Sequence, residues 1–166
     1  MGGKTVDYVI GLKPDPELKK RIKQTLALHP QLSRSLNQTP YSAIRTFIVF
    51  LSIETNPRAT GGQQAEVQLA TWGYSGFVKL HQLLAKNGNR DEQLPAMPML
   101  SAHGHNWLLS ALHEDGDDNK LLSTLPLGTT QTIQGIFQII KALDLIVHWG
   151  NTEYRNWYLS KVLRTD

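Results

Sequence analysis

Two acidic residues stand where the sequence otherwise predicts buried strands. Asp7 lies within the apolar, β-branched stretch Thr5–Leu12, and Glu54 follows Ile44–Ile53, the most hydrophobic segment of the chain. A carboxylate in such a place is costly to bury without a cation or strong hydrogen bonds. If the two converge, their oxygens form a site for Mg²⁺ or Mn²⁺. The alternative is that Glu54 ends a strand in solvent and that Asp7 pairs with a cation such as Arg45.

The composition narrows the class of protein that holds these acids. The chain has 166 residues, with 17 Lys and Arg against 14 Asp and Glu, a net charge of +3, and no cysteine. This length predicts a single domain over residues 1–166. Without cysteine, disulfides, thiolate zinc sites and cysteine nucleophiles are excluded. Because the sequence shows neither a membrane-length apolar run nor a signal region, we expect an intracellular protein, cytoplasmic or nuclear, with no membrane partner. A mild positive charge permits nucleic-acid binding without requiring it.

The remaining pattern predicts strands and helices that would position the acids in a mixed sheet flanked by helices, an α/β fold. Besides the two strands above, we expect a basic helix over 17–28, a loop over 31–42, a long helix over 63–85, strands over 96–102 and 106–113, an acidic loop over 114–119, and a second long helix that begins at Thr129 or Thr130. Gly150 is expected to break that helix, and a short aromatic helix follows.

Both long helices carry apolar residues at three- and four-residue spacing, the pattern of a helix face that packs on a core. In the first helix Gly73 and Gly76 suggest close packing against the sheet, because glycine inside a helix is otherwise unfavourable. The two stripes are Val67, Ala70, Tyr74, Phe77, His81 and Leu84 in the first helix, and Ile133, Ile136, Phe137, Ile140, Leu143 and Val147 in the second.

Several short motifs occur in a strand–strand–helix order along most of the chain. They are Val6-Asp7-Tyr8, Ser52-Ile53-Glu54-Thr55, Ala65-Glu66-Val67-Gln68-Leu69, Gly104-His105-Asn106-Trp107 and Gly135-Ile136-Phe137-Gln138-Ile139-Ile140. With these motifs the chain resembles the PD-(D/E)XK nuclease-like superfamily, which has the restriction-endonuclease-like fold. More narrowly, it looks like a domain common in fungal proteins.

The resemblance implies roles for individual residues. Asp7 and Glu54 correspond to the two acids that hold a divalent metal, which polarises the scissile phosphate and activates a water. Asn56 stands where the family has its catalytic Lys. Gln68, followed by Leu69 and the aromatic Trp72, is similar to the Gln-hydrophobic-x-x-Tyr motif of the exonuclease branch. The family usually has a helix before the first core strand, and here we expect that helix to be absent.

Replacement of the motif Lys is expected to lower activity, because losing one preorganised catalytic donor typically costs about 10²–10³ in rate. The resemblance therefore predicts weak or absent metal-dependent phosphodiester hydrolysis. Two alternatives stay open: a non-catalytic module that binds nucleic acid or protein, and a pocket reused for a small molecule, with acid–base or cyclisation chemistry in fungal secondary metabolism. The expected site residues are Asp7, Glu54, Asn56 and Gln68. The residues expected to line a pocket around them are Tyr8, Gln64, Trp72, His105 and Trp107.

Overall fold

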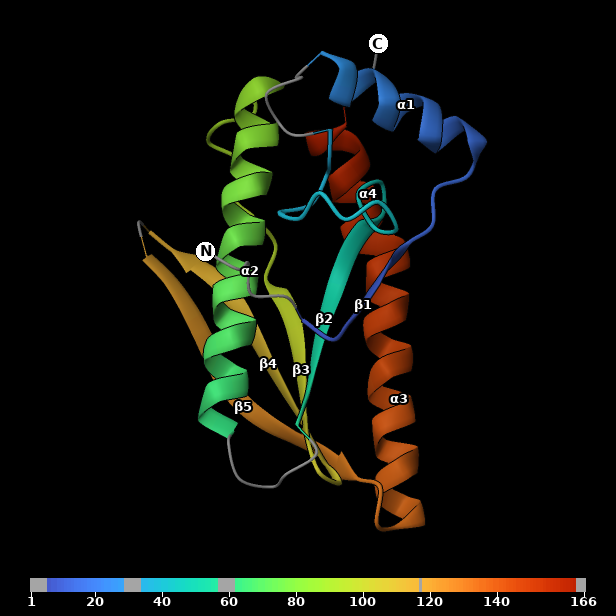
Figure 1. Ribbon diagram of the computed structural model, residues 1–166, viewed down its shortest axis with the longest axis vertical. Helices are drawn as coiled ribbons and strands as arrows, with labels where there is room; N and C mark the ends of the chain where they lie inside the picture. The colour runs from blue at the N-terminus through green and yellow to red at the C-terminus, as the bar shows by residue number, and fades with distance from the viewer. Residues whose placement is uncertain (1–5, 29–33, 57–61, 117, 164–166) are drawn as a thin grey trace.

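Five strands form one mixed sheet in which they follow their order along the chain (Figure 1). The computed structural model describes residues 6–28, 34–56, 62–116 and 118–163. The strands are β1 (Tyr8–Leu12), β2 (Ile48–Asn56), β3 (Met97–His103), β4 (Asn106–Asp115) and β5 (Asp118–Thr129). Only β2 and β3 run parallel among these neighbours, and the other three pairs are antiparallel. The predicted α/β fold with a mixed sheet and flanking helices is confirmed.

The helices connect and cover the strands. Helix α1 (Pro16–Ala27) begins after Asp15, whose carboxylate accepts a hydrogen bond from the Leu18 backbone N–H at 2.8 Å. Helix α2 (Gly62–Lys86) makes the crossover between the parallel strands β2 and β3 and lies across the near face of the sheet in Figure 1. Strand β5 leads into α3 (Ile133–Trp149), where the hydroxyl of Thr132 caps the first turn. None of the helices in these described ranges has the length and apolarity to span a bilayer.

The segment after the β3–β4 hairpin differs from the sequence prediction. The strands expected over 96–102 and 106–113 are confirmed as β3 and β4, but the expected acidic loop over 114–119 is wrong: β4 continues to Asp115, the chain turns at Gly116 with φ +64°, and β5 starts at Asp118. Strand β5 was not predicted because Pro126 and Gly128 are poor strand residues. An edge strand tolerates them, and β4–β5 pairing is irregular next to both.

The apolar stripes predicted for the long helices match the buried faces only in part. In α2 the predicted Phe77 and Leu84 are buried, but Val67 and Tyr74 are 51% and 53% exposed. The core side of α2 also carries Leu69, Trp72, Leu80 and Leu83. Gly73 faces the sheet as expected, since a Cβ there would lie 3.1 Å from the Leu112 side chain. In α3 most of the predicted stripe is exposed, and the buried residues are Gly135 and Ile139.

The expected helix break at Gly150 is also wrong. The helical path continues past α3 through a π-helical turn (Gly150–Tyr154), the short α4 (Arg155–Trp157) and a second π-helical turn (Tyr158–Val162). Gly150 has ordinary helical angles, with φ −61°. It is needed because a Cβ at this position would lie 2.6 Å from the ring of the buried Phe50. Packing against β2, and not helix termination, therefore explains this glycine.

Replacing Gly150 with Ala is expected to lower the free energy of unfolding by about 1–3 kcal/mol, the usual cost of overpacking a core. The gain in helix propensity, about 1 kcal/mol, offsets only part of that cost. Gly76→Ala is the matched control, because a Cβ there meets only the Gln38 side-chain amide at an ordinary 3.5 Å. Urea unfolding followed by circular dichroism should show opposite signs for the two variants. Equal effects would contradict the role assigned to the Phe50 contact.

A bulge in β2 decides which residues of this strand face α2. Ile10 pairs with Leu51 and the next residue, Gly11, pairs with Val49, so that Phe50 is an extra residue in β2. Side chains alternate between the two faces of a strand, and an inserted residue reverses this alternation. Phe50 accordingly packs on Gly150, whereas Ser52 accepts a hydrogen bond at 3.0 Å from the Trp72 indole N–H of α2.

Candidate acidic site

The two predicted acids lie side by side at the β1–β2 border. Tyr8 pairs with Ile53, so Asp7 immediately before β1 lies opposite Glu54 in β2. The Asp7 backbone N–H donates to the Glu54 carboxylate, and the Asp7 charge acts on the same group. The strand pairing thus brings together two carboxylates that are 47 positions apart in the sequence. Contrary to the simple expectation that Glu54 closes its strand, β2 continues to Asn56.

Thr55 holds the Asp7 carboxylate in place. The Thr55 backbone N–H and hydroxyl both donate to Oδ2 of Asp7, at 2.9 and 2.6 Å. The alternative pairing of Asp7 with Arg45 is not observed: none of the ion pairs between described residues involves Asp7. Because both donors bind the same oxygen, this contact fixes the carboxylate while its other oxygen, Oδ1, takes no part in it.

Glu54 is a buried carboxylate with an incomplete set of partners. The residue is 8% exposed, and within the described part of the chain Oε2 is buried without a hydrogen-bond partner. Burial raises the pKa of Glu54, the neighbouring Asp7 charge raises it further, and the hydrogen bond from the Asp7 N–H partly opposes both. A bound cation would satisfy the orphaned oxygen and offset the repulsion between the two acids.

The donor set fits a hard divalent cation only in part. Two carboxylates suit Mg²⁺ or Mn²⁺, which in proteins commonly take their other ligands from water and substrate oxygens. No group of three or more His, Cys, Asp or Glu side chains suited to a metal occurs in the described ranges. Asp7 and Glu54 would therefore hold the ion, and the remaining ligands would have to come from backbone, water or substrate.

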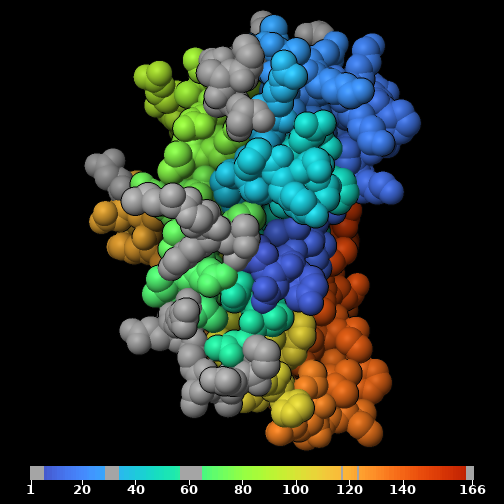
Figure 2. All heavy atoms as spheres, in the orientation of Figure 1, coloured from blue at the N-terminus to red at the C-terminus, as the bar shows by residue number. Residues whose placement is uncertain are grey.

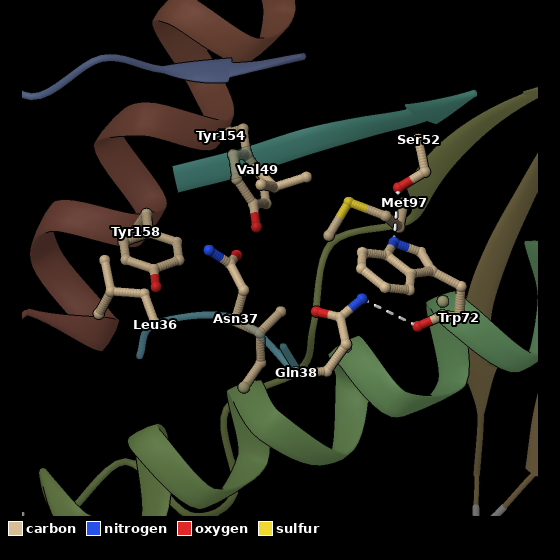
Figure 3. A pocket seen from close by; sticks show the side chains of 12 residues that line it. Leu36, Asn37, Gln38, Val49, Ser52, Trp72, Met97, Tyr154 and Tyr158 are labelled. Atoms are coloured by element: carbon tan, nitrogen blue, oxygen red, sulfur yellow. Dashed lines mark hydrogen bonds between the residues drawn. The ribbon is translucent and has the colours of Figure 1, made fainter. Parts of the chain in front are cut away.

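Asn56 and Gln68 belong to the same side of the sheet as Glu54. Ser52, Glu54 and Asn56 are every second residue of β2 after the bulge, so their side chains share one side of the sheet. Ser52 contacts Trp72 of α2 on this side (Figure 3). Gln68 lies one helical turn before Trp72. Gln64 lies one turn earlier still, but its side chain is outside the described part of the structure.

Comparison with family models gives a match over nearly the whole chain. The model of the PD-(D/E)XK nuclease superfamily matches residues 1–155. The chain belongs to this superfamily. Neither a search of curated proteins nor a search of solved structures found a match. The predicted relationship to the PD-(D/E)XK superfamily is thus confirmed at the level of the superfamily.

One residue of this PD-(D/E)XK sheet was passed over as a site residue at the sequence level. His103 is the last residue of β3 and pairs with Asn56. Met99, four residues earlier in β3, faces Gly73 of α2. Because side chains alternate along a strand, His103 points to the same side as Met99, which is also the side of Glu54. It is 6% exposed, and neither ring nitrogen has a partner among the described residues. The sequence pointed to His105 because that residue lies in a family-like motif, whereas only the strand register singles out His103.

The other expected pocket residues separate into three places. Tyr8 and Trp72 border a hollow of about 360 Å³ beside Asp7, together with Val6, Val9, Thr39, Tyr41 and Ile44. Figure 2 shows β1 and the segment 34–47 side by side on this face. Trp107 borders a second cavity of about 680 Å³ next to α3, which His103 also borders. His105 is exposed at the hairpin turn, with Nδ1 3.0 Å from the Thr130 hydroxyl.

The raised pKa of Glu54 makes the metal-free protein sensitive to pH. Because the folded pKa lies above the unfolded one, the folded state binds more protons, and stability falls as pH rises from about 4.5 through the folded pKa. In EDTA at neutral pH, the free energy of unfolding of Glu54→Gln should therefore be about 1 kcal/mol higher than that of the wild type. Below the ordinary pKa of Glu the two proteins should be equally stable. A pH series of urea unfolding curves measures this, and a constant difference at all pH values would contradict it.

Proposed function

We propose that this PD-(D/E)XK chain binds a divalent cation between Asp7 and Glu54 and hydrolyses phosphodiesters weakly. The observation that carries the proposal is the buried Glu54 carboxylate, whose Oε2 has no partner in the described structure and which lies opposite Asp7. An isolated buried charge is unfavourable. The Asp7 N–H offsets it only in part, and Thr55 donates to Asp7 and not to Glu54. A cation supplied by the solvent would do so.

The residues around the acids would act as follows. Asp7, fixed by Thr55, and Glu54 would each contribute one carboxylate to the ion. A divalent ion bound there polarises a phosphate oxygen and lowers the pKa of a bound water. Asn56 can hydrogen-bond that water but carries no positive charge, so it neither stabilises hydroxide nor offsets phosphate charge as Lys does. With a neutral residue at this position, the chain should therefore still bind the metal but should hydrolyse phosphodiesters slowly.

The direct test uses the wild-type chain and supercoiled plasmid with Mn²⁺, Mg²⁺ or EDTA. We expect slow nicking with either metal and none in EDTA, together with saturable Mn²⁺ binding measured by calorimetry. Binding without nicking would support the metal site and remove the catalytic part of the proposal. Absence of Mn²⁺ binding would remove both.

The hollow beside Asp7 favours one second candidate, a site for a flat organic ligand. Its volume of about 360 Å³ is that of a small ligand pocket. The exposed rings of Tyr8 and Tyr41 and the buried ring of Trp72 border it, and Asp7 gives it one charged group. A molecule bound there would lie directly beside the acid pair, where the same carboxylates could take part in acid–base chemistry.

Tyr41→Ala tests this second candidate with the dye anilinonaphthalene sulfonate as probe. Loss of one aromatic contact should weaken dye binding by about two- to tenfold, which corresponds to 0.5–1.5 kcal/mol. Tyr74→Ala is the control, since Tyr74 is 53% exposed on α2 and does not border the hollow. If both variants bind the dye as the wild type does, the hollow is not an aromatic site.

A further inference from the structure

Helix α3 has an apolar face that points away from its own chain. Ile133, Ile136, Phe137 and Ile140, here called the α3 apolar face, are 76%, 40%, 67% and 56% exposed. Their spacing of three and four residues puts them on one stripe of the helix. The opposite side of α3 packs on the protein through Gly135, Ile139 and the partly buried Ile146. The stripe of the α3 apolar face continues into Leu143 and Val147, where it is partly buried against the core.

The size of this face is that of an interface. With these exposed fractions, four aliphatic and aromatic side chains leave on the order of 450 Å² of apolar surface in one patch. Monomeric proteins rarely expose contiguous apolar patches beyond a few hundred Å². A stable interface buries about 800 Å² on each partner, of which the apolar centre is a part and a polar rim is the rest. The neighbouring polar residues Gln134, Lys141 and Asp144 of α3 are available for such a rim.

The arrangement of the four residues selects a second copy of the same chain. A two-fold axis that crosses α3 between Ile136 and Phe137 pairs these two residues with each other across the interface. The same axis pairs Ile133 with Ile140. Every member of the face thus meets another member, which is the condition for an isologous contact. A helix running antiparallel to its symmetry mate satisfies it.

The charges agree with a partner of the same kind. No charged residue or histidine occurs from residue 121 to residue 140, so the face offers nothing that would select a charged partner. The first charge is Lys141, and it is paired with Asp144 of the same helix at 3.0 Å. We propose that this chain forms a two-fold symmetric dimer in which the α3 apolar faces of two copies pack antiparallel. Asp7 and Glu54 do not belong to this face, and the inference does not depend on the proposed metal site.

The test is the mass of the whole chain in solution, measured by sedimentation over a wide range of concentration. The wild type is expected to be a dimer, and Phe137→Glu is expected to weaken association by about thirtyfold or more, as a hot-spot loss does. Leu145→Glu is the matched control: Leu145 is also exposed on α3, at 58%, but lies off the stripe. Circular dichroism checks that all three proteins are folded.

Cross-linking tests the geometry, because the natural chain has no cysteine. A mixture of Ile133→Cys and Ile140→Cys chains should form an oxidised cross-link, whereas each variant alone should not. A wild-type chain that is monomeric at every concentration would overturn the proposal, as would a dimer that survives Phe137→Glu. Cross-linking of either variant alone would overturn the antiparallel pairing.

Discussion

Replacing Glu54 with Gln is expected to weaken Mn²⁺ binding by at least about a hundredfold, since even the removal of a group that supports a metal ligand costs 10–100-fold. The amide keeps the shape of the side chain and an oxygen that can accept from the Asp7 N–H, but it removes the charge that the ion would neutralise. Calorimetric titration of the metal-free protein with Mn²⁺ measures the loss. The largest effect is expected here because Glu54 is the buried acid of the pair, with an oxygen that has no partner in the described part of the chain.

The control for this variant is Glu17→Gln, which removes an exposed acid from the first turn of α1. It should bind Mn²⁺ as the wild type does. Thermal unfolding adds an independent readout, because a ligand at a hundredfold excess over Kd stabilises the folded state by about 2.7 kcal/mol. The metal should therefore raise the Tm of the wild type and of Glu17→Gln but not that of Glu54→Gln. An equal rise in all three proteins would mean that Mn²⁺ binds elsewhere.

The second large effect is a gain of function in Asn56→Lys. Restoring a charged group at the position of the family's catalytic Lys is expected to raise plasmid nicking in Mn²⁺ by about 10²–10³-fold. Asn56 ends β2 two residues after Glu54 on the same face, so a Lys side chain there starts beside the acid pair. Initial nicking rates of the variant and the wild type, measured with equal protein and metal concentrations, test the expectation.

Two further variants decide how a gain in Asn56→Lys is interpreted. Asn56→Met has a side chain of comparable reach without the charge and should stay at the wild-type rate. The double variant Glu54→Gln, Asn56→Lys should be inactive. A rate gain in Asn56→Met would show that the charge is not the cause, and a rate gain in the double variant would show that the activity does not need Glu54. Adding His103→Gln to Asn56→Lys then measures what the imidazole opposite residue 56, which has no partner among the described residues, contributes.

The sequence predicted those parts of the fold whose local pattern agrees with their environment. The hydrophobic strand that became β2, the helix α1 with its acidic start and the hairpin of β3 and β4 all have such patterns. Strand β5 escaped prediction because Pro126 and Gly128 contradict strand propensity, and only its place at the edge makes them acceptable. Gly150 was misread for a similar reason, since its cause is a ring that lies 100 positions away in the sequence.

The candidate site shows the same division between local and long-range information. Asp7 and Glu54 were found because acids inside apolar strands are unusual, and their juxtaposition follows from β1–β2 pairing. His103 could not be ranked above His105 without the strand register, because both flank the same glycine. The exposed side of α3 was predicted as a buried stripe, because amphipathic spacing does not say whether a helix packs on its own chain or on another one.

The extra residue at Phe50 determines to which side of the sheet each later side chain of β2 points. Glu54 and Asn56 lie on the α2 side only because the extra residue shifts the alternation of side chains in β2 by one position relative to β1. A single-residue deletion between Val49 and Ser52 would turn both side chains toward the opposite side while leaving the hydrophobic pattern almost intact. Lineages that keep the acids should therefore accept insertions in the 34–47 segment far more readily than in this short stretch, whose length is as much a part of the site as the carboxylates.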